Sequence, residues 1–293
     1  MGKNKNKSIR PRITQEEYNI LLGIRNQCES HELSIKDVPH GWVKSKESSL
    51  FFRNPDYKAP SLDAFRAELL KEIKQHSPVE WIEEKRDKNA KHLLVIDPAD
   101  IHIGKLASSF ETGEDYNNQI AVQRVMEGVN GIINKSSGFD TEKILFIGGN
   151  DVLHVDTPRR TTTSGTPQDT DGMWYDNFRL ALALYIDVLF NLSKIAPVHF
   201  QFNPSNHDYM SGFFLCQALA AYLHANKDIT FDVDIKHRKY FRYYNNLIGS
   251  THGDGAKTTD LPLLMAHESE HWSSVKHRYF YTHHLQHKHS YNL

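Results

Sequence analysis

From residue 92 onward, short apolar runs alternate with longer stretches whose apolar positions recur every three or four residues. The first pattern is typical of buried strands and the second of amphipathic helices. Strands are expected at residues 92–96, 144–147, 198–202, 231–235, 240–244, 247–251 and 279–281, and helices at about residues 121–135, 174–193 and 213–226. This order predicts an α/β domain with helices on both faces of a mixed sheet, and Asn245 with Asn246 is expected to form a hairpin turn.

The region before the first of these strands has a different character. Residues 1–90 are expected to form a basic arm and a small helical region, joined by residues 78–90 to a main domain at residues 91–293. The arm, residues 1–12, carries five cations and no acid, and a solvated tail is favoured over contact with a polyanion. Thr14 and Glu17 form a capping box that predicts a helix over residues 13–25, and an amphipathic helix is expected at residues 61–75.

Residues 41–57 interleave aromatic side chains with lysine and arginine. Such a mixture suits phosphate contact combined with base stacking. The favoured interpretation is a loop that its aromatic side chains hold against the domain, and nucleic-acid contact is the alternative.

Composition narrows the class of protein. The net charge of −1 gives no global signal for nucleic acid or membrane, and the chain contains no apolar run long enough to cross a bilayer. Two distant cysteines argue against a disulfide framework, so a cytoplasmic location is expected. The 18 histidines are unusual for 293 residues and favour a metal-binding protein.

Residue types that bind metals follow five of the expected strands. They are Asp100 and His102, Asp151 and His154, Asn206 with His207 and Asp208, His252, and finally His284 and His287. Ligands bind at the carboxyl ends of strands in open α/β sheets. A carboxylate, imidazole and amide set favours Mn²⁺, Fe or Zn²⁺ over Ca²⁺, which prefers oxygen ligands alone.

The series Asp-x-His, Gly-Asn-Asp, Asn-His-Asp, His-Gly and a terminal histidine cluster resembles the motifs of the calcineurin-like metallophosphoesterases, and the resemblance spans about residues 93–287. It implies a four-layered α/β/β/α sandwich with a two-metal centre and a metal-bridging water as nucleophile. It further implies that Asp100 and His102 hold one metal, that Asp151 bridges both, and that Asn206, His252 and His284 hold the second. His207 would act beside the phosphate, oriented by Asp208.

The segment from Asp151 to His154 is also similar to the second motif of the double-strand-break-repair nucleases of this superfamily, and it implies a catalytic role for His154. Arg159 and Arg160 follow and are candidate substrate-binding cations. Residues 161–172 form a polar stretch that is weighed equally as a substrate-entry loop and as a plain surface loop. Residues 236–242 are weighed equally as a nucleic-acid track and as a strand with one solvated face.

Three departures from the family pattern affect the expected metal set. Ser205 stands where the family has glycine, and only a permissive backbone is expected to be needed there. Asn150 precedes Asp151, and Asp151 is preferred as the bridging ligand because a bridge between two cations needs a carboxylate. Gln286 stands where a histidine ligand of the first metal is usual, and His287 is the candidate replacement.

The favoured function is a metal-dependent phosphodiester hydrolase, a DNA nuclease of the exonuclease type, with two divalent metal ions and Mn²⁺ preferred over Fe, Zn²⁺ and Mg²⁺. The alternatives are a phosphatase or small-molecule phosphodiesterase with the same metals, and a catalytically weak nucleic-acid-binding protein. DNA is the expected partner, no membrane partner is expected, and a homodimer or a partner subunit is left open.

Overall fold

The computed structural model describes residues 91–284 continuously, and before them residues 19, 22–26, 28, 34, 38, 40–44, 49–54, 67 and 71. The chain divides into two compact units, Met1–Phe65 and Arg66–Leu293. The division falls earlier in the chain than the boundary at residue 90 that the sequence suggested.

The first unit contains an antiparallel hairpin. Strand β1, His40–Lys44, pairs with β2, Ser49–Arg53, in a register that sets Trp42 opposite Phe51. The expectation of a loop over residues 41–57 is therefore wrong for these strands, because aromatic and β-branched side chains there favour a pleated ribbon. The expected arm at residues 1–12 and the link at residues 78–90 lie outside the described residues. Residues 22–26, 67 and 71, which belong to the two expected N-terminal helices, are helical.

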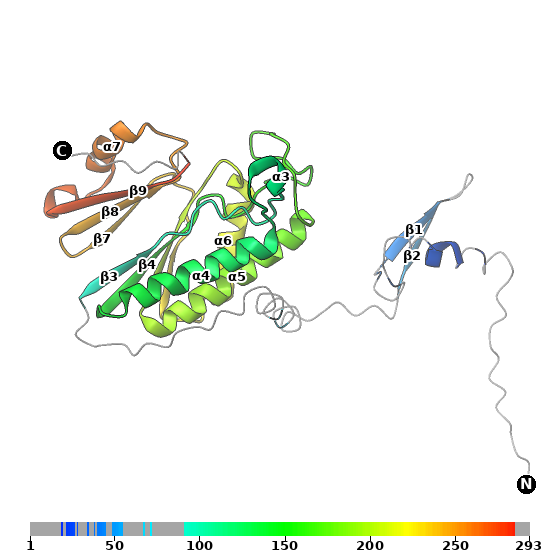
Figure 1. The fold of residues 1–293 in the computed structure, drawn as a ribbon, viewed down its shortest axis with the longest axis horizontal. Helices are drawn as coiled ribbons and strands as arrows, with labels where there is room; N and C mark the ends of the chain where they lie inside the picture. The colour runs from blue at the N-terminus through cyan, green and yellow to red at the C-terminus, as the bar shows by residue number, and fades with distance from the viewer. Residues whose placement is uncertain are drawn as a thin grey trace, which may run out of the picture. The chain divides into compact units, whose positions relative to one another are not determined.

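The second unit contains two β-sheets (Figure 1). Four parallel strands form the first sheet in the order β3, His92–Ile96; β4, Thr141–Gly149; β5, Val198–Asn203; and β6, Ile229–Asp232. The second sheet is mixed, with β8, Asn246–Thr251, antiparallel to β7, Lys239–Tyr243, and parallel to β9, His277–Thr282. The α/β class is confirmed, whereas the expected single mixed sheet is two sheets.

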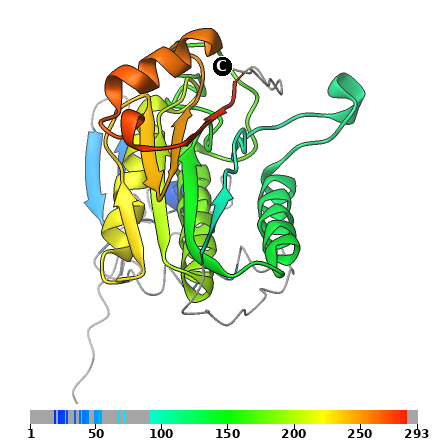
Figure 2. The same ribbon diagram turned by 90° about the vertical axis from the view of Figure 1, so that its left-hand side faces the viewer.

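Helices lie on the outer face of each sheet (Figures 1 and 2). The first sheet is covered by α4, Asn118–Ser136; α5, Trp174–Ile195; and α6, Tyr209–Leu223. The short α7, Leu261–Glu268, covers the second sheet, where Met265 packs with Leu247 and Val275. The faces without helices meet through Leu145 and Ile147 of β4 and Ile248 of β8. Among the described residues, each sheet therefore carries helices on one face only, which corrects the expectation of helices on both faces of one sheet.

Alternation along β5 explains this layering. Phe200 contacts the ring of Tyr185 on α5, and Phe202 contacts Phe213 on α6. Between them, Gln201 donates a hydrogen bond to Ser250 in the second sheet. Because successive side chains of a strand point to opposite faces, β5 separates a purely apolar interface with the helices from a partly polar one between the sheets.

The other predicted elements agree with the structure within a few residues. The turn between β7 and β8 is Tyr244 with Asn245, one residue earlier than expected, and Tyr244 has a φ of 49°. The remaining named elements are the helix α3, Ser109–Thr112, and the 3₁₀ turns η2, Thr258–Asp260, and η3, Trp272–Ser274.

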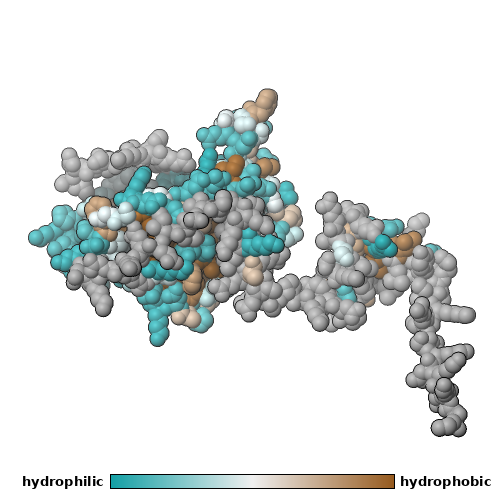
Figure 3. All heavy atoms as spheres, turned by 60° about the horizontal axis from the view of Figure 1, so that its bottom comes forward, coloured by the Kyte–Doolittle hydropathy of each residue, from teal (hydrophilic) through white to brown (hydrophobic). Residues whose placement is uncertain are grey.

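No helix among the described residues is long and apolar enough to cross a membrane. Hydrophilic side chains predominate among the described atoms on the face shown in Figure 3.

The glycine pair at the end of β4 is required by close packing. An added Cβ at Gly148 would collide with the ring of Phe200, and one at Gly149 would overlap the carbonyl oxygen of Asn203. Gly149 also has a φ of 83°, in the region that L-residues avoid. The bulky neighbours for which the glycines leave room therefore come from β5.

Gly149→Ala is expected to lower the free energy of unfolding by about 3 kcal/mol or more, because a left-handed backbone and overpacking act together. The matched control is Gly131→Ala in α4, where an added Cβ meets nothing within 4 Å. The control is expected to raise stability by about 0.5–1 kcal/mol through helix propensity. Chemical denaturation of both variants tests the pair, and equal effects would contradict the packing argument.

Candidate functional site

Two chain segments continue the β3–β4 pairing beyond the strand ends and bring the first candidate ligands together. The backbone N–H of Asp100 donates to the carbonyl of Asn150, and that of His102 donates to the carbonyl of Asp151, each at 2.9 Å. Asp100 and His102 are thereby set beside Asp151 and His154 at the carboxyl edge of the first sheet.

The next segments converge on Asp151. Its Oδ1 accepts the backbone N–H of His207 at 3.0 Å, and its Oδ2 lies 3.3 Å from Nε2 of His252. The same Nε2 lies 2.8 Å from Oδ1 of Asn206, and the ring of His284 is centred 5.2 Å from that of His252. The structure thus gathers candidate ligands from five segments, which follow β3, β4 and β5 of the first sheet and β8 and β9 of the second.

The backbone is strained at this edge. Asp100, His102, Asp151 and His284 have positive φ values of 53°, 49°, 64° and 62°. Such a conformation costs on the order of 1–3 kcal/mol for a residue other than glycine, and it persists where the surrounding structure enforces it. Its concentration at the candidate ligands indicates a site rather than a set of ordinary turns.

The electrostatics fit a cation. Burial and the neighbouring Asp151 carboxylate raise the pKa of Asp100. Burial, together with the surrounding histidines, lowers the pKa of His102 to about 2, and burial lowers the pKa of His154 to about 4. The carboxylates are therefore crowded, and His102 and His154 are neutral at pH 7, as imidazoles that bind a metal must be.

The donor set also passes a chemical test for metal binding. Asp100, His102 and Asp151 each present a ligand atom within 4.8 Å of the others. Nδ1 of His252 is buried and has no hydrogen-bond partner among the described residues, and such an atom is costly unless it binds something. Mixed oxygen and nitrogen ligands suit Mn²⁺, Fe or Zn²⁺.

Comparison with known proteins adds no assignment. No protein-family model matches the chain, and no curated protein or solved structure matches it either. Any function must therefore be argued from the geometry of the site and from the sequence motifs.

Asp208 and Ser205 form a buried connection that the sequence did not indicate. The hydroxyl of Ser205 donates to Oδ1 of Asp208 at 2.5 Å and accepts the backbone N–H of Asp151 at 2.7 Å. Oδ2 of Asp208 accepts the backbone N–H of Leu153 at 2.8 Å. Ser205 therefore does more than permit a backbone conformation, because it joins the segment after β5 to the segment after β4.

The ring of His207 is held differently from the expectation. Its Nδ1 lies 3.0 Å from the backbone carbonyl oxygen of His154, whereas the carboxyl of Asp208 bonds to Ser205 and Leu153. A histidine that donates Nδ1–H to a carbonyl has a fixed tautomer with Nε2 unprotonated. The positioning group for His207 is thus a backbone oxygen.

Asp208→Asn is expected to remove a pH dependence of stability in metal-free protein. Burial, followed by the charge of Asp151, raises the pKa of Asp208 from 3.8 to about 8. Between these values the unfolded chain binds fewer protons at this position than the folded chain, so stability is present at low pH and is lost as pH rises towards 8. Asparagine reproduces the protonated acid, because its NH₂ group can donate to Ser205 while its oxygen accepts from Leu153.

Denaturant unfolding in chelator, at about pH 5 and about pH 8, measures this effect. The unfolding free energy of the wild type is expected to fall more between the two pH values than that of Asp208→Asn. Asp208→Ala, which removes the acceptor of the buried Ser205 hydroxyl and of the Leu153 N–H, is expected to cost about 2–5 kcal/mol at both pH values. Parallel pH profiles for the wild type and Asp208→Asn would contradict the assignment.

The last motif is only partly described. His284 lies in the cluster, whereas Gln286 and His287 fall outside the described residues. His283, which directly precedes His284, has its Nε2 3.1 Å from Oδ1 of Asp97, although no hydrogen bond joins the two atoms. This contact ties the end of β9 to the end of β3.

Of the cations near the cluster, one was not expected from the sequence. Arg159 and Arg160 are exposed, and the guanidinium of Arg160 contacts the sulfur of Met173. Lys105 lies close enough to lower the pKa of both His102 and His154. Sequence reasoning missed Lys105, although it follows the Asp-x-His motif by only three residues.

The structure also shows what surrounds residues 236–242 and residues 161–172. Most of the positive charge at residues 236–242 is compensated, because Lys236 pairs with Asp234, Arg238 with Glu268, and the buried Lys239 with Asp232 and Asp234. This pairing favours the structural interpretation of that stretch over a nucleic-acid track. The polar residues 161–172 adjoin the site, since Thr163 N donates to the carbonyl of Asn206 and Asp171 N to that of Gly104.

A cavity of about 350 Å³ lies between the end of β3 and α4. Asp97 and Asp100 form part of its wall, Tyr116 and Arg124 contribute polar groups, and apolar side chains such as Val125 line the remainder. The cavity therefore adjoins the candidate metal ligands through Asp100.

Proposed function

We propose that the chain is a metal-dependent phosphodiester hydrolase of the calcineurin-like metallophosphoesterase superfamily, and that its substrate is DNA. The observation that carries the proposal is the convergence of Asp100, His102, Asp151, Asn206 and His252 on one edge of the sheet, with strained backbone at three of them. The order of helix and sheet layers supports the proposed fold family, in which a four-layered sandwich is expected.

The metal-holding roles follow from the contacts. Asp100 and His102 would hold one ion, Asp151 would contact both, and Asn206, His252 and His284 would hold the second. Two divalent cations in such a cluster supply Lewis-acid activation of the attacking water and of the phosphate. Mn²⁺ is the preferred ion, and His287 is the candidate for an additional ligand.

The chain's own residues supply the proton and the orientation. Hydrolysis joins the oxygen of water to phosphorus and breaks the bond to the leaving oxygen, which must then receive a proton. His207 is the proposed carrier of that proton: Nε2 accepts the proton that the attacking water loses and passes it to the leaving oxygen, while Nδ1–H stays on the carbonyl of His154 and the backbone N–H stays on Asp151. Ser205 and Asp208 fix the position of Asp151, and Lys105, Arg159 and Arg160 are the proposed contacts to substrate phosphates.

A small phosphodiester is the second candidate substrate, and the cavity beside Asp100 favours it. A volume of about 350 Å³ with apolar walls and Arg124 suits one base or one aromatic leaving group better than a duplex. Exposed Arg159 and Arg160 on an open loop favour a long polyanion instead. The proposal of DNA also rests on the resemblance of the segment from Asp151 to His154 to nuclease motifs.

The experiment that tests the proposal is Mn²⁺-dependent degradation of end-labelled linear duplex and single-stranded DNA by the full chain. Degradation by the wild type, but not by a variant lacking the Asp151 carboxylate, would support the nuclease. Cleavage of bis-p-nitrophenyl phosphate without cleavage of DNA would replace it by the small-substrate enzyme. If neither substrate is cleaved while DNA is bound, the protein is a nucleic-acid-binding protein. Gln286→His is then the first substitution to test for a gain of cleavage.

A further inference from the structure

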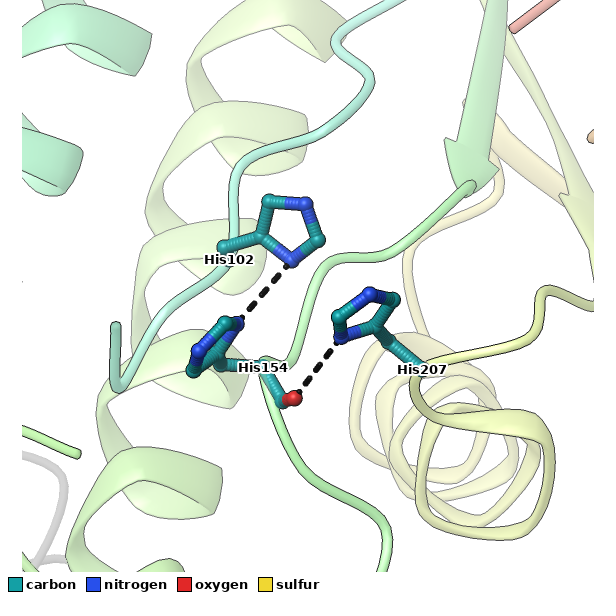
Figure 4. Close-up of side chains that lie close together, drawn as sticks. All are labelled: His102, His154 and His207. Carbon is teal, nitrogen blue, oxygen red and sulfur yellow. Dashed lines mark hydrogen bonds between the residues drawn. The ribbon is translucent and has the colours of Figure 1, made fainter. Parts of the chain in front are cut away.

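Three histidine rings from three segments face one another beside the carboxylate cluster (Figure 4). They are His102 after β3, His154 after β4 and His207 before α6, with ring centroids 4.6–5.3 Å apart. One ring nitrogen of each lies within 4.8 Å of the others. In the proposed hydrolysis His102 holds a metal and His207 moves a proton, and neither role requires the three rings to lie together.

His102 presents a different nitrogen to each of its neighbours. Its Nε2 lies 3.9 Å from Oδ1 of Asp100, on the side of the carboxylates. Its Nδ1 lies 3.4 Å from Nδ1 of His154, on the opposite edge of the ring. The Nδ1 atoms are therefore available to a site that does not include the carboxylates.

The 3.4 Å between Nδ1 of His102 and Nδ1 of His154 matches a known coordination geometry. Ligands on a tetrahedral zinc ion with Zn–N bonds of about 2.0–2.1 Å lie roughly 3.4 Å apart. His207 fits the same site, because the hydrogen bond from its Nδ1 to the carbonyl of His154 leaves Nε2 free as a ligand. A second ring nitrogen that donates to a carbonyl is the usual support for a metal-binding histidine.

We propose that His102, His154 and His207 form a separate Zn²⁺ site that shares His102 with the carboxylate cluster and that inhibits hydrolysis when it is filled. When both sites are filled, His102 bridges them as an imidazolate and its ring proton goes to solvent. Three imidazole ligands favour Zn²⁺ over Mn²⁺ or Mg²⁺, which prefer oxygen ligands. Zinc in this site occupies Nε2 of His207, so that Nε2 can no longer carry a proton to the leaving group. The inhibitory part rests on the proposed function, whereas zinc binding does not.

Zinc binding is tested without substrate. The full chain is stripped of metal, saturated with Mn²⁺ and titrated with Zn²⁺ by calorimetry, and bound metals are counted after gel filtration. We expect one equivalent of Zn²⁺ in addition to the retained Mn²⁺, and X-ray absorption is expected to show imidazole nitrogen as its main ligand. One-for-one replacement of Mn²⁺ by Zn²⁺, with no additional equivalent, would overturn the site.

Variants separate this site from the carboxylate cluster. His154→Gln, which preserves side-chain volume, is expected to lose the additional zinc and to retain Mn²⁺, and Asp100→Asn is expected to weaken Mn²⁺ binding and to retain the additional zinc. The control is His267→Ala, which removes an exposed histidine of α7 and is expected to bind zinc as the wild type does. Circular dichroism confirms folding, and unchanged zinc binding by folded His154→Gln would overturn the proposal.

The functional consequence is measured on the Mn²⁺-loaded wild type. One equivalent of Zn²⁺ is expected to reduce hydrolysis at least about a hundredfold, the scale of losing a general acid, and selective chelation is expected to restore it. Zinc binding without inhibition would overturn the regulatory part. If the Mn²⁺ enzyme hydrolyses nothing, the proposed function fails while the zinc stoichiometry still decides the site.

Discussion

Asp151→Asn is expected to reduce phosphodiester hydrolysis by at least about a thousandfold, on the order of 4 kcal/mol of transition-state stabilisation. The carboxylate is buried, with one oxygen on the backbone N–H of His207 and the other facing His252. Asparagine keeps the size of the side chain and an oxygen for the His207 N–H. It removes the negative charge that a position between two cations requires.

Three measurements test this prediction. The value of kcat/KM on DNA and on bis-p-nitrophenyl phosphate gives the rate effect, and metal analysis is expected to find fewer than two bound ions. In chelator, the variant is expected to melt at or above the temperature of the wild type, because the substitution removes the charge that helps to raise the pKa of Asp100.

The matched control is Asp140→Asn, which neutralises an exposed carboxylate just before β4 and is expected to leave kcat/KM unchanged. Full activity in Asp151→Asn would remove Asp151 from the site and return attention to Asn150, the other candidate for the bridging position.

His207→Ala is expected to reduce the cleavage of DNA by about a hundredfold to ten-thousandfold while two metal ions remain bound. The contact between residue 207 and Asp151 is made by the backbone, so that the carboxylate keeps its partner in the variant. The loss arises because the leaving alkoxide no longer receives a proton.

The choice of substrate distinguishes this role from a structural one. Nitrophenolate is a good leaving group that needs little protonation, so the loss on bis-p-nitrophenyl phosphate is expected to be much smaller than the loss on DNA. The control is His224→Ala, at the opposite end of α6, where an exposed ring contacts the carbonyl of Ala221. Equal losses on both substrates, or loss of metal, would show that His207 is not the general acid.

The sequence located the strands and most helices because these depend on neighbours along the chain. The alternation of apolar runs with helical periodicity gave β3 and β5 nearly to the residue and the centre of β4. It also located Asp100, His102, Asp151 and His154, since these residues follow strand ends and parallel strands end at one edge. The hydrophobic pattern did not separate the strands into two sheets, which only the family resemblance implied, because pairing partners depend on which faces meet in space.

For the site, too, local sequence indicated some features and only the tertiary structure decided others. Residue types and their order along the chain indicated a metal-binding edge. Local pattern did not determine whether Ser205 only permits a backbone conformation or makes hydrogen bonds. It also did not determine whether Asp208 or a backbone carbonyl orients His207, or whether the cations at residues 236–242 are paired with acids. These outcomes depend on partners elsewhere in the chain, such as Asp232, Asp234 and Glu268, which compensate those cations.

By itself, then, the sequence determined the α/β order, the strand ends and the candidate ligands, because each is encoded within a few neighbouring residues. Only the tertiary structure decided the two facing sheets, the proximity of Lys105 and the meeting of His102, His154 and His207. The contacts that join these segments connect residues 52 to 55 positions apart. Their geometry is fixed by the packing of β3, β4 and β5, which no local pattern contains.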